Sequence, residues 1–315
     1  GRTRYLNAYP VDPEGIRTLP TPHSLFLVKG EEAPNTIYDF ALQAVHEVNG
    51  EKVQFVAARE RSFCQLNDDE IHFISPQRRV NVHTQRNRVK GRAAKKATET
   101  DTENDGSVFQ YDSLEKDQTF FGWVLVEGDE DAERLTSLLQ RIRHFGGSSN
   151  SGYGRVLVEV DAPMDVAQKH WREPVGSRIN GIDAGNTFIV TLLSDMLIRH
   201  PETGNHTWDV QLVLQKSLGA AIEYVQGAKA DDQRSIWRIE EVGGFNRTWG
   251  LPLTQAQAIA AGSVFVFQAK EAISQEAVAA VEWLGIGERR AEGFGRVAFN
   301  WQQEPELTVI EPSKN

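Results

Sequence analysis

The sequence predicts an α+β protein built from two similar units. The order strand, helix, glycine loop, strand occurs twice in the 315 residues, and both copies end on Gly, aromatic residue, Gly, Arg, Val, at Gly152–Val156 and Gly293–Val297. A repeat of whole elements indicates two homologous domains. We expect each to be a ferredoxin-like βαββαβ unit, with one domain over residues 1–163 and the other over 164–315.

The first half of the chain predicts only the later elements of such a unit. A helical segment is expected over residues 36–47 and a strand over 53–58. Residues 120–128 predict a strand, and the leucines and isoleucine of 129–144 recur at intervals of three and four, which indicates an amphipathic helix. The opening strand and helix of the unit are missing before Gly1. We therefore expect the first domain to be truncated at its N-terminus and to carry long insertions.

The second half predicts the complete unit. The expected strands are 186–198, 235–242, 264–270 and the segment after the second glycine loop, and the expected helices are 210–224 and 274–284. Ser274 is suited to be the N-cap of the last helix, because its hydroxyl can accept from a free N–H of the first turn.

Composition restricts the class of protein. Hydrophobic residues make up 40% of the chain, which is enough for a buried core. No run of 18 apolar residues is present, so no membrane partner is expected. The single cysteine, Cys64, excludes an internal disulfide framework and a cysteine-based zinc site. A reducing, cytoplasmic location is the expectation.

The charge is distributed unevenly. The net charge of −10 argues by itself against a phosphate-binding protein. Residues 86–96, the basic strip, nevertheless hold six basic residues and no acid, and four acids follow within 99–105. The strip lies in a polar stretch, 86–118, that we expect to be a long loop. Two interpretations stay open: a loop whose cations neutralise RNA phosphates, or an ordinary charged surface loop.

The two glycine loops, residues 146–155 and 285–296, are the main candidate binding elements. Glycine allows positive φ and a close approach of the backbone to another molecule, and successive N–H groups can hold an anion. Each loop follows a helix instead of preceding one, so a nucleotide cofactor is not expected. A phosphodiester backbone fits better, with arginine and an aromatic ring as further contacts. The alternative is a tight turn whose aromatic ring packs into the core.

The candidate RNA-binding residues come from four segments. Besides the basic strip and the glycine loops, residues 243–252 place two aromatic rings around an arginine, which suits single-stranded RNA or, alternatively, a hairpin whose tryptophan caps the core. The candidates are His83, Arg86, Arg88, Lys90 and Arg92; Gly152, Tyr153, Gly154 and Arg155; Phe245, Arg247 and Trp249; and Gly287, Arg289, Arg290, Gly293, Phe294, Gly295 and Arg296.

No catalytic or metal-binding residue is predicted. The eight histidines show no metal-ligand spacing, and Cys64 is expected to pack as a small hydrophobic residue. Asp183 or Asp195 could serve a metal-dependent or acid/base ribonuclease, although a lone aspartate near a strand is more often structural.

Several motifs resemble the RAMP superfamily, the ferredoxin-like subunits of CRISPR–Cas effector complexes. Gly285–Gly295 is similar to the C-terminal glycine-rich loop of that superfamily, G-x-G-x5-G-x-G. The loop Gly244–Pro252, and Tyr5–Pro10 followed by Arg17–Pro22, resemble the Csx-type RAMP of type III-D systems. The stretch from His83 to Gly122 is similar to the RAMP segment that meets guide RNA.

The resemblance implies an RNA-binding scaffold subunit of a type III effector complex that acts in antiviral defence. Such subunits hold the guide RNA (crRNA), often its 5′ tag, and dock against the large polymerase-like subunit and the backbone RAMPs. Target RNA is a further partner of such complexes. Backbone RAMPs also cut target RNA with a loop aspartate, which has no match here, so an endoribonuclease stays open as the alternative.

Overall fold

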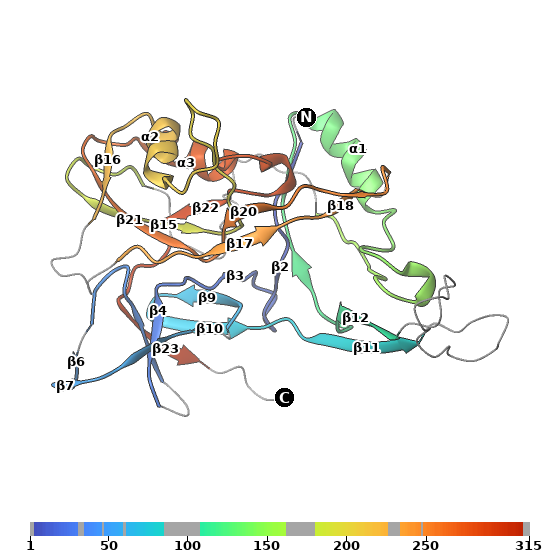
Figure 1. The fold of residues 1–315 in the computed structure, drawn as a ribbon, viewed down its shortest axis with the longest axis horizontal. Coiled ribbons are helices and arrows are strands. Elements are labelled where there is room, and N and C mark those ends of the chain that lie inside the picture. Colours follow the sequence, from blue (N-terminus) through green and yellow to red (C-terminus); the bar gives the residue numbers. More distant parts are fainter. Residues whose placement is uncertain are drawn as a thin grey trace, which may run out of the picture. The chain divides into compact units, whose positions relative to one another are not determined.

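The computed structural model describes residues 3–30, 35–45, 47–58, 61–84, 108–161, 180–225, 234–246 and 248–310 (Figure 1). The chain forms two compact units, Gly1–Ser75 with Thr119–Gly128 and Met164–Asn315 (unit 1), and Pro76–Gln118 with Asp129–Pro163 (unit 2). The first 75 residues thus cluster with the second half of the chain, whereas the sequence repeat predicts a division between residues 163 and 164. The architecture is mixed α+β and rich in strands.

The second half of the chain forms a four-stranded antiparallel sheet in the order β16-β21-β15-β22. The strands are β15 (Thr187–Leu192), β16 (Ile222–Tyr224), β21 (Val264–Ala269) and β22 (Val297–Phe299). Helix α2 (Val210–Leu218) lies between β15 and β16 in the chain, and α3 (Gln275–Leu284) lies between β21 and β22. Within this sheet and its two helices the chain order is βαββαβ, with a further segment that contains strands between β16 and β21.

Helix α3 begins where the sequence predicted, and α2 ends earlier. The Ser274 side chain accepts a hydrogen bond from the Ala277 N–H at 3.2 Å, so Ser274 caps α3. The predicted helix 210–224 stops at Leu218, because Gly219 takes a positive φ of 67° and its N–H bonds back to Gln215. The last residues of that predicted helix form strand β16 instead.

The sequence predicted that residues 235–242 form the second strand of this sheet, and this prediction is wrong. The segment contains β17 (Ile239–Val242), which pairs with β20 (Ala256–Ile259) in a separate two-stranded sheet. A second short pair, β18 (Phe245–Asn246) with β19 (Leu251–Pro252), lies between these two strands in the chain. Helix α2 ends early enough for residues 222–224 to pair with β21. Of the predicted strand 235–242, Ile236 forms an isolated bridge with Val264 of β21, and β17 forms the hairpin with β20.

The N-terminal part of unit 1 is a seven-stranded sheet that contains the last strand of the chain. Its order is β3-β9-β10-β23-β5-β4-β8. The strands are β3 (Leu19–Pro20), β4 (Leu25–Val28), β5 (Thr36–Asp39), β8 (Phe55–Ala57), β9 (Phe63–Asn67), β10 (Glu70–Ile74) and β23 (Glu306–Ile310). The last strand, β23, pairs parallel with β10 and antiparallel with β5. The predicted helical segment 36–47 is wrong, since β5 occupies its start.

Three short strand pairs complete unit 1. They are β1 (Arg4–Tyr5) with β14 (Val124–Leu125), β2 (Tyr9–Pro10) with β13 (Phe120–Phe121), and β6 (Glu47–Val48) with β7 (Glu51–Lys52). The strand predicted over residues 120–128 is therefore two short strands, which pair with the first residues of the described chain. Cys64 is buried in β9, as expected of a small hydrophobic residue.

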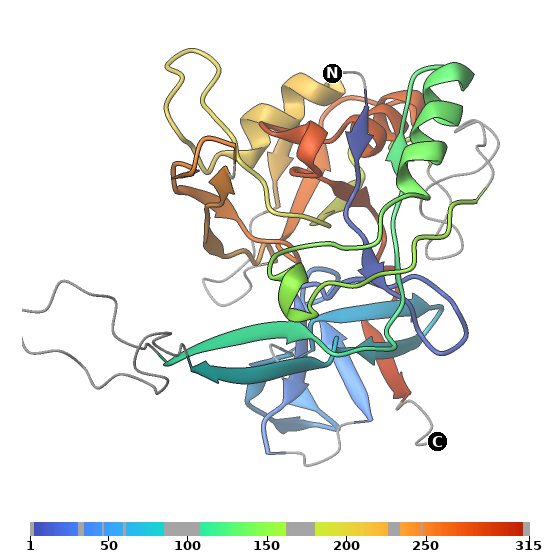
Figure 2. The ribbon, with the colours of Figure 1, turned by 90° about the vertical axis from the view of Figure 1, so that its right-hand side faces the viewer.

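In its described residues, unit 2 holds a hairpin, the α-helix α1 and the first glycine loop (Figure 2). Strand β11 (Arg78–Thr84) pairs antiparallel with β12 (Val108–Leu114), and helix α1 spans Asp129–Leu139. The predicted loop 86–118 therefore contains a strand at its end. The basic strip lies outside the described residues. No helix in the described parts of the chain is long and apolar enough to cross a membrane.

The buried carboxyl group of Asp39 predicts a pH-dependent stability. Burial raises the pKa of Asp39 to about 6, although its carboxylate accepts from the Ala41 N–H at 2.9 Å. The folded state binds this proton more tightly than the unfolded chain. The free energy of unfolding should therefore fall by about 3 kcal/mol as the pH rises from about 4 to about 6. Urea denaturation at both pH values measures the change. Asp39→Asn should lose this part of the pH dependence, and an identical pH profile in both proteins would contradict the assignment.

Candidate nucleic-acid interface

The two glycine loops have the same backbone conformation. Each contains one turn of 3₁₀ helix, η1 (Ser149–Ser151) in the first loop and η2 (Arg290–Glu292) in the second. Positive φ angles recur at a constant offset along the chain: 82° and 84° at Gly146 and Gly287, 59° and 53° at Ser148 and Arg289, 85° and 91° at Gly152 and Gly293, and 71° and 69° at Gly154 and Gly295. The repeated sequence pattern is therefore a repeated local structure.

The last glycine of each loop is required by a close backbone contact. A β-carbon on Gly154 would fall on the carbonyl oxygen of Phe145, and one on Gly295 would fall on that of Ile286. The Phe145 N–H donates to the Gly154 carbonyl at 2.8 Å, and the Ile286 N–H donates to the Gly295 carbonyl at 2.8 Å. In both loops this close approach is to the protein itself, which is the alternative that the sequence left open.

The second glycine loop packs against the rest of unit 1. A β-carbon on Gly293 would lie 2.7 Å from Oδ1 of Asn7, and one on Gly287 would overlap the Leu197 carbonyl. The Gly295 N–H donates to the Asp195 carbonyl at 2.8 Å. These glycines fit the loop to its own fold, so the prediction that Gly287, Gly293 and Gly295 admit an RNA backbone is not supported at this loop.

Arg296 does not belong to the candidate interface, and this corrects the sequence prediction. Its side chain is 2% exposed, and its guanidinium donates to the carbonyl oxygens of Trp283, at 2.6 Å, and Glu282. Burial lowers the pKa of Arg296 to about 10. The residue binds the free carbonyls at the C-terminal end of α3, where a helix leaves acceptors unpaired.

The other two arginines of this loop lie near its surface. Arg289 forms a forked ion pair with Glu292, with Nε at 3.1 Å from Oε1 and Nη2 at 2.5 Å from Oε2. Its guanidinium also lies 4.4 Å from the ring centre of Phe294. Arg289 is thus held by two neighbours, whereas Arg290 is exposed. Of the predicted cations at this loop, Arg290 is the best placed to meet a ligand.

The first glycine loop is exposed at positions where the second loop contacts other residues of its unit. A β-carbon on Gly152 would meet nothing within 4 Å, and Arg155, the counterpart of Arg296, is exposed. Tyr153 and Gly154 are half-buried. The aromatic residue of this loop does not point into a core of its own: it contacts the β11–β12 hairpin.

Four rings form an aromatic cluster in unit 2: His83, Phe109, Tyr111 and Tyr153. A hydrogen bond of 2.7 Å joins Nε2 of His83 and the hydroxyl of Tyr153. His83 stacks on Phe109 with ring centres 5.5 Å apart and planes 15° apart. Tyr111 meets the edges of its neighbours, at 5.0 Å from both His83 and Tyr153. The structure therefore brings together two predicted site residues that are 70 positions apart.

The sequence prediction missed Phe109 and Tyr111. Both lie on β12, two residues apart and so on the same face, opposite His83 and Asn81 of β11. The signal was present in the alternation of Val108–Leu114, but the polar residues before it favoured a loop. Phe109 remains 37% exposed, so one ring of the cluster has a face available to a ligand.

The predicted residues of the basic strip, Arg86, Arg88, Lys90 and Arg92, lie outside the described residues. In the sequence they begin three positions after His83, at the end of β11. The aromatic cluster thus lies at the point where the chain enters its most basic segment.

The loop between β18 and β19 exposes its aromatic residues. Phe245 is 60% and Trp249 is 72% exposed. The Asn246 side chain accepts from the N–H groups of Thr248 and Trp249, at 3.0 and 3.1 Å, and so fixes the turn. Trp249 does not cap the core, which was the alternative for this segment. Arg247 lies outside the described residues.

The two aspartates considered for catalysis lie apart from the aromatic cluster in the sequence. Asp183 is exposed in a turn, and its carbonyl accepts from the Asn186 N–H at 3.1 Å. Asp195 accepts from the Ala261 N–H at 2.9 Å through Oδ1. In the described part of the chain no group of three His, Cys, Asp or Glu side chains could hold a metal ion.

Comparisons with known proteins find similarity to solved structures. No protein-family model and no curated protein matches the sequence. The cryo-EM structure of the type III-B Cmr-beta bound to cognate target RNA contains a chain that is 14% identical to this one, with a TM-score of 0.34. The similarity covers 83% of this chain and 65% of that chain. This protein therefore spans less than two thirds of the neighbour's length.

Proposed function

We propose that this protein is an RNA-binding scaffold subunit of a type III CRISPR ribonucleoprotein, a RAMP subunit of the III-D Csx type that acts in the cytoplasm in antiviral defence. In this proposal it holds guide RNA, its 5′ tag in particular, and docks against the large polymerase-like subunit and the backbone RAMPs. The single observation that carries it is the aromatic cluster, which the basic strip follows directly in the sequence. The matched glycine loops support the finer fold, in which the chain carries two related domains of the ferredoxin-like type.

The aromatic cluster has the chemistry of a single-stranded RNA site. Unpaired bases stack on aromatic and histidine rings, and this contact tolerates any base because each one has a π-face. The exposed ring of Phe109 lies against His83, which a hydrogen bond to Tyr153 holds in place. A base stacked on Phe109 would therefore meet a ring whose position is already fixed.

The basic strip concentrates positive charge in a chain whose net charge is −10. Each phosphate that its cations neutralise releases counterions, and the affinity then falls as salt is added. Stacking contributes little to this salt dependence, whereas the cations contribute most of it. The two parts of the proposed interface can therefore be separated by experiment.

Exchanging the rings tests the stacking part. The double variant Phe109→Ala, Tyr153→Ala should weaken binding of a short single-stranded RNA by about 5- to 150-fold for each stacked base that is lost, with the salt slope unchanged. Fluorescence anisotropy on the full 315-residue chain at several salt concentrations measures both quantities. Tyr153→Phe keeps the ring and should retain most of the affinity.

Exchanging the cations tests the charge part. Arg86→Ala with Arg88→Ala should flatten the salt slope by about one to two units. Lys52→Ala, an exposed cation on β7, is the matched control and should leave the slope unchanged. If neither the ring variant nor the strip variant alters RNA binding, the proposed interface is wrong.

A further inference from the structure

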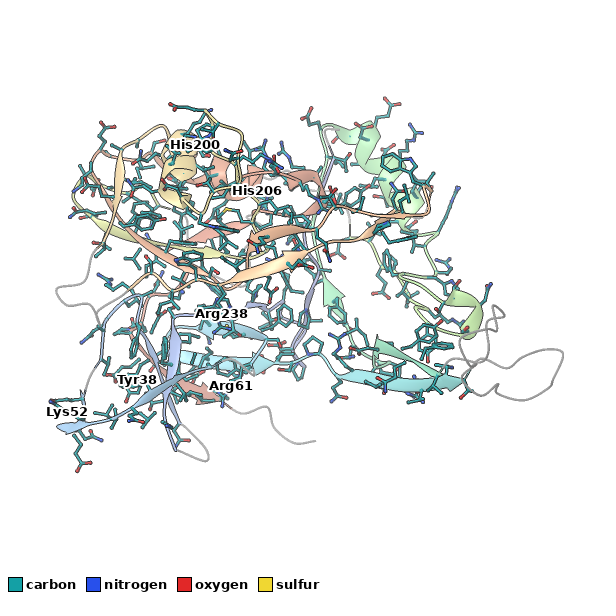
Figure 3. All side chains as sticks on the ribbon, in the orientation of Figure 1. Tyr38, Lys52, Arg61, His200, His206 and Arg238 are labelled. Atoms are coloured by element: carbon teal, nitrogen blue, oxygen red, sulfur yellow. The ribbon has the colours of Figure 1, made fainter. Side chains whose placement is uncertain are left out.

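The β11–β12 hairpin has two faces of different character, and side chains project from both of them (Figure 3). Side chains alternate between the faces along each strand, and directly paired residues share a face. The register therefore places three rings of the aromatic cluster together on one face, the ring face. Its members are Arg79, Asn81, His83, Phe109, Tyr111 and Ser113. Arg78 and Asp112 lie on the opposite face.

Two consecutive arginines at the start of β11 differ in their partners. Arg78 makes a forked ion pair with Asp112 on the opposite face, with Nε at 2.9 Å from Oδ1 and Nη2 at 2.6 Å from Oδ2. Arg79 donates instead from Nε to Oδ1 of Asn81, at 3.1 Å. That amide is neutral, and no acidic residue of β11 or β12 lies on the ring face. The charge of the exposed Arg79 is therefore not balanced on this face of the hairpin.

The hydrogen bond from Arg79 fixes which way the Asn81 amide points. A guanidinium group can only donate, so the amide oxygen faces Arg79 and the amide nitrogen points away from it. The bond uses Nε of Arg79 and leaves the fork of its two terminal nitrogens out. Within the described part of the chain these three nitrogens make no other hydrogen bond. Arg79 and Asn81, the donor pair, thus offer donors only.

The donor pair lies beside the rings on which a base would stack. Asn81 pairs directly with Tyr111 and lies diagonally opposite Phe109, and side chains in both positions are within reach of one another. Phe109 is 37% exposed, whereas Asn81 is half-buried. A base that stacks on Phe109 and extends toward Tyr111 would therefore bring one of its edges to the donor pair.

Donors without acceptors select a base edge that carries acceptors. Adenine has an amino group beside N7, and uracil has an N–H beside O4, so either base would set a donor against a donor. Guanine has N7 and O6 side by side, and this is the edge that arginine binds most often. Cytosine also has two adjacent acceptors, N3 and O2, but its single ring stacks over a smaller area. Guanine therefore fits the ring face best.

A phosphate oxygen also accepts from such donors, and the exposed Arg79 alone could hold one. The position of Asn81 argues against this ligand, because its amide is half-buried beside Tyr111. A phosphate placed there would lose the water that surrounds its charge, whereas the edge of a flat base loses much less. The half-buried amide thus favours a stacked base over the RNA backbone.

We infer that Arg79 and Asn81 bind the N7 and O6 edge of a guanine that stacks on the aromatic cluster. The inference rests on the proposed function, since it requires that the cluster holds single-stranded RNA. It adds a base preference to that function. Stacking alone does not supply one, because every base has a π-face.

Binding of a short oligouridylate with one central guanine, adenine or cytosine to the full 315-residue chain tests the inference. Fluorescence anisotropy should show at least about tenfold tighter binding of the guanine oligonucleotide than of the adenine one. Arg79→Gln should reduce this ratio to less than about twofold. Asn81→Asp keeps an oxygen for Arg79 but replaces the amide nitrogen with an acceptor, so the preference for guanine should be lost as well.

Arg78→Gln is the matched control, because Arg78 is the neighbouring arginine on the opposite face. It should leave the ratio of the guanine and adenine affinities within about twofold of the parent value. A ratio that falls as far in Arg78→Gln as in Arg79→Gln would contradict the assignment to the ring face.

The outcomes separate this inference from the proposed function. Equal binding of the guanine and adenine oligonucleotides, or tighter binding of the cytosine one, would overturn the inference while the ring and strip variants still test RNA binding. An equal loss for all three oligonucleotides in Arg79→Gln, together with a flatter salt slope, would show a phosphate contact and overturn it too. If the parent chain binds none of them, the proposed function itself fails, and the inference fails with it.

Discussion

Replacing Gly295 with alanine is expected to lower the free energy of unfolding by more than about 3 kcal/mol. The added β-carbon would fall on the carbonyl oxygen of Ile286, and Gly295 has a φ of 69°, which L-residues rarely adopt. The Ile286 N–H also donates to the Gly295 carbonyl at 2.8 Å, so neither segment can move away without losing that bond. Urea denaturation followed by circular dichroism measures the loss.

A matched glycine separates the steric overlap from the cost of the backbone conformation. Gly185, also in unit 1, has a φ of 86°, and a β-carbon there would meet nothing within 4 Å. Gly185→Ala should therefore cost only about 1–2 kcal/mol, the price of a left-handed conformation. An equal loss of unfolding free energy in the two variants would contradict this prediction. It would show that the loop shifts easily to accept a β-carbon at Gly295.

Arg296→Met is expected to destabilise the protein by about 3–5 kcal/mol. The methionine removes the donors that bind the Glu282 and Trp283 carbonyls, and it leaves the buried Glu282 side chain, which is 0% exposed, without the nearby positive charge. Buried acceptors that lose a charged donor carry the full cost of their desolvation. A thermal or urea melt of the full chain measures this change.

The first glycine loop offers the control for this prediction. Arg155 occupies the same place in the repeated pattern but is exposed, so Arg155→Met should change the stability by no more than about 0.5 kcal/mol. The same substitution at two matched positions then differs only in burial. A similar loss at both positions would contradict a structural role specific to Arg296.

The contrast between these two arginines shows what the sequence can and cannot predict. The repeat itself was readable, and so were the starts of the two helices in the second half and the cap of α3 at Ser274, because spacing and capping are local properties. Burial is not local. Arg155 and Arg296 follow the same pattern, yet only Arg296 lies under the end of a helix, and no neighbouring residue in the sequence signals this.

The aromatic cluster illustrates the same limit at the candidate site. His83 and Tyr153 could each be singled out by residue type, but their hydrogen bond joins positions 70 residues apart. Phe109 and Tyr111 were missed because the acidic and basic residues before them dominate the composition of that stretch. Strand pairing, which sets Phe109 opposite His83, is a long-range property that alternation alone leaves undetermined.

The position of β23 in the seven-stranded sheet has a consequence for biosynthesis. Its residues Thr308 and Val309 pair with Glu70 and Ile71, and Leu307 pairs with Ile37. During translation the early strands leave the ribosome long before their central partner exists, so two unpaired edges, on β5 and β10, stay open to other chains. The nascent protein should therefore depend on chaperones or on rapid capture by its neighbours until β23 has been synthesised.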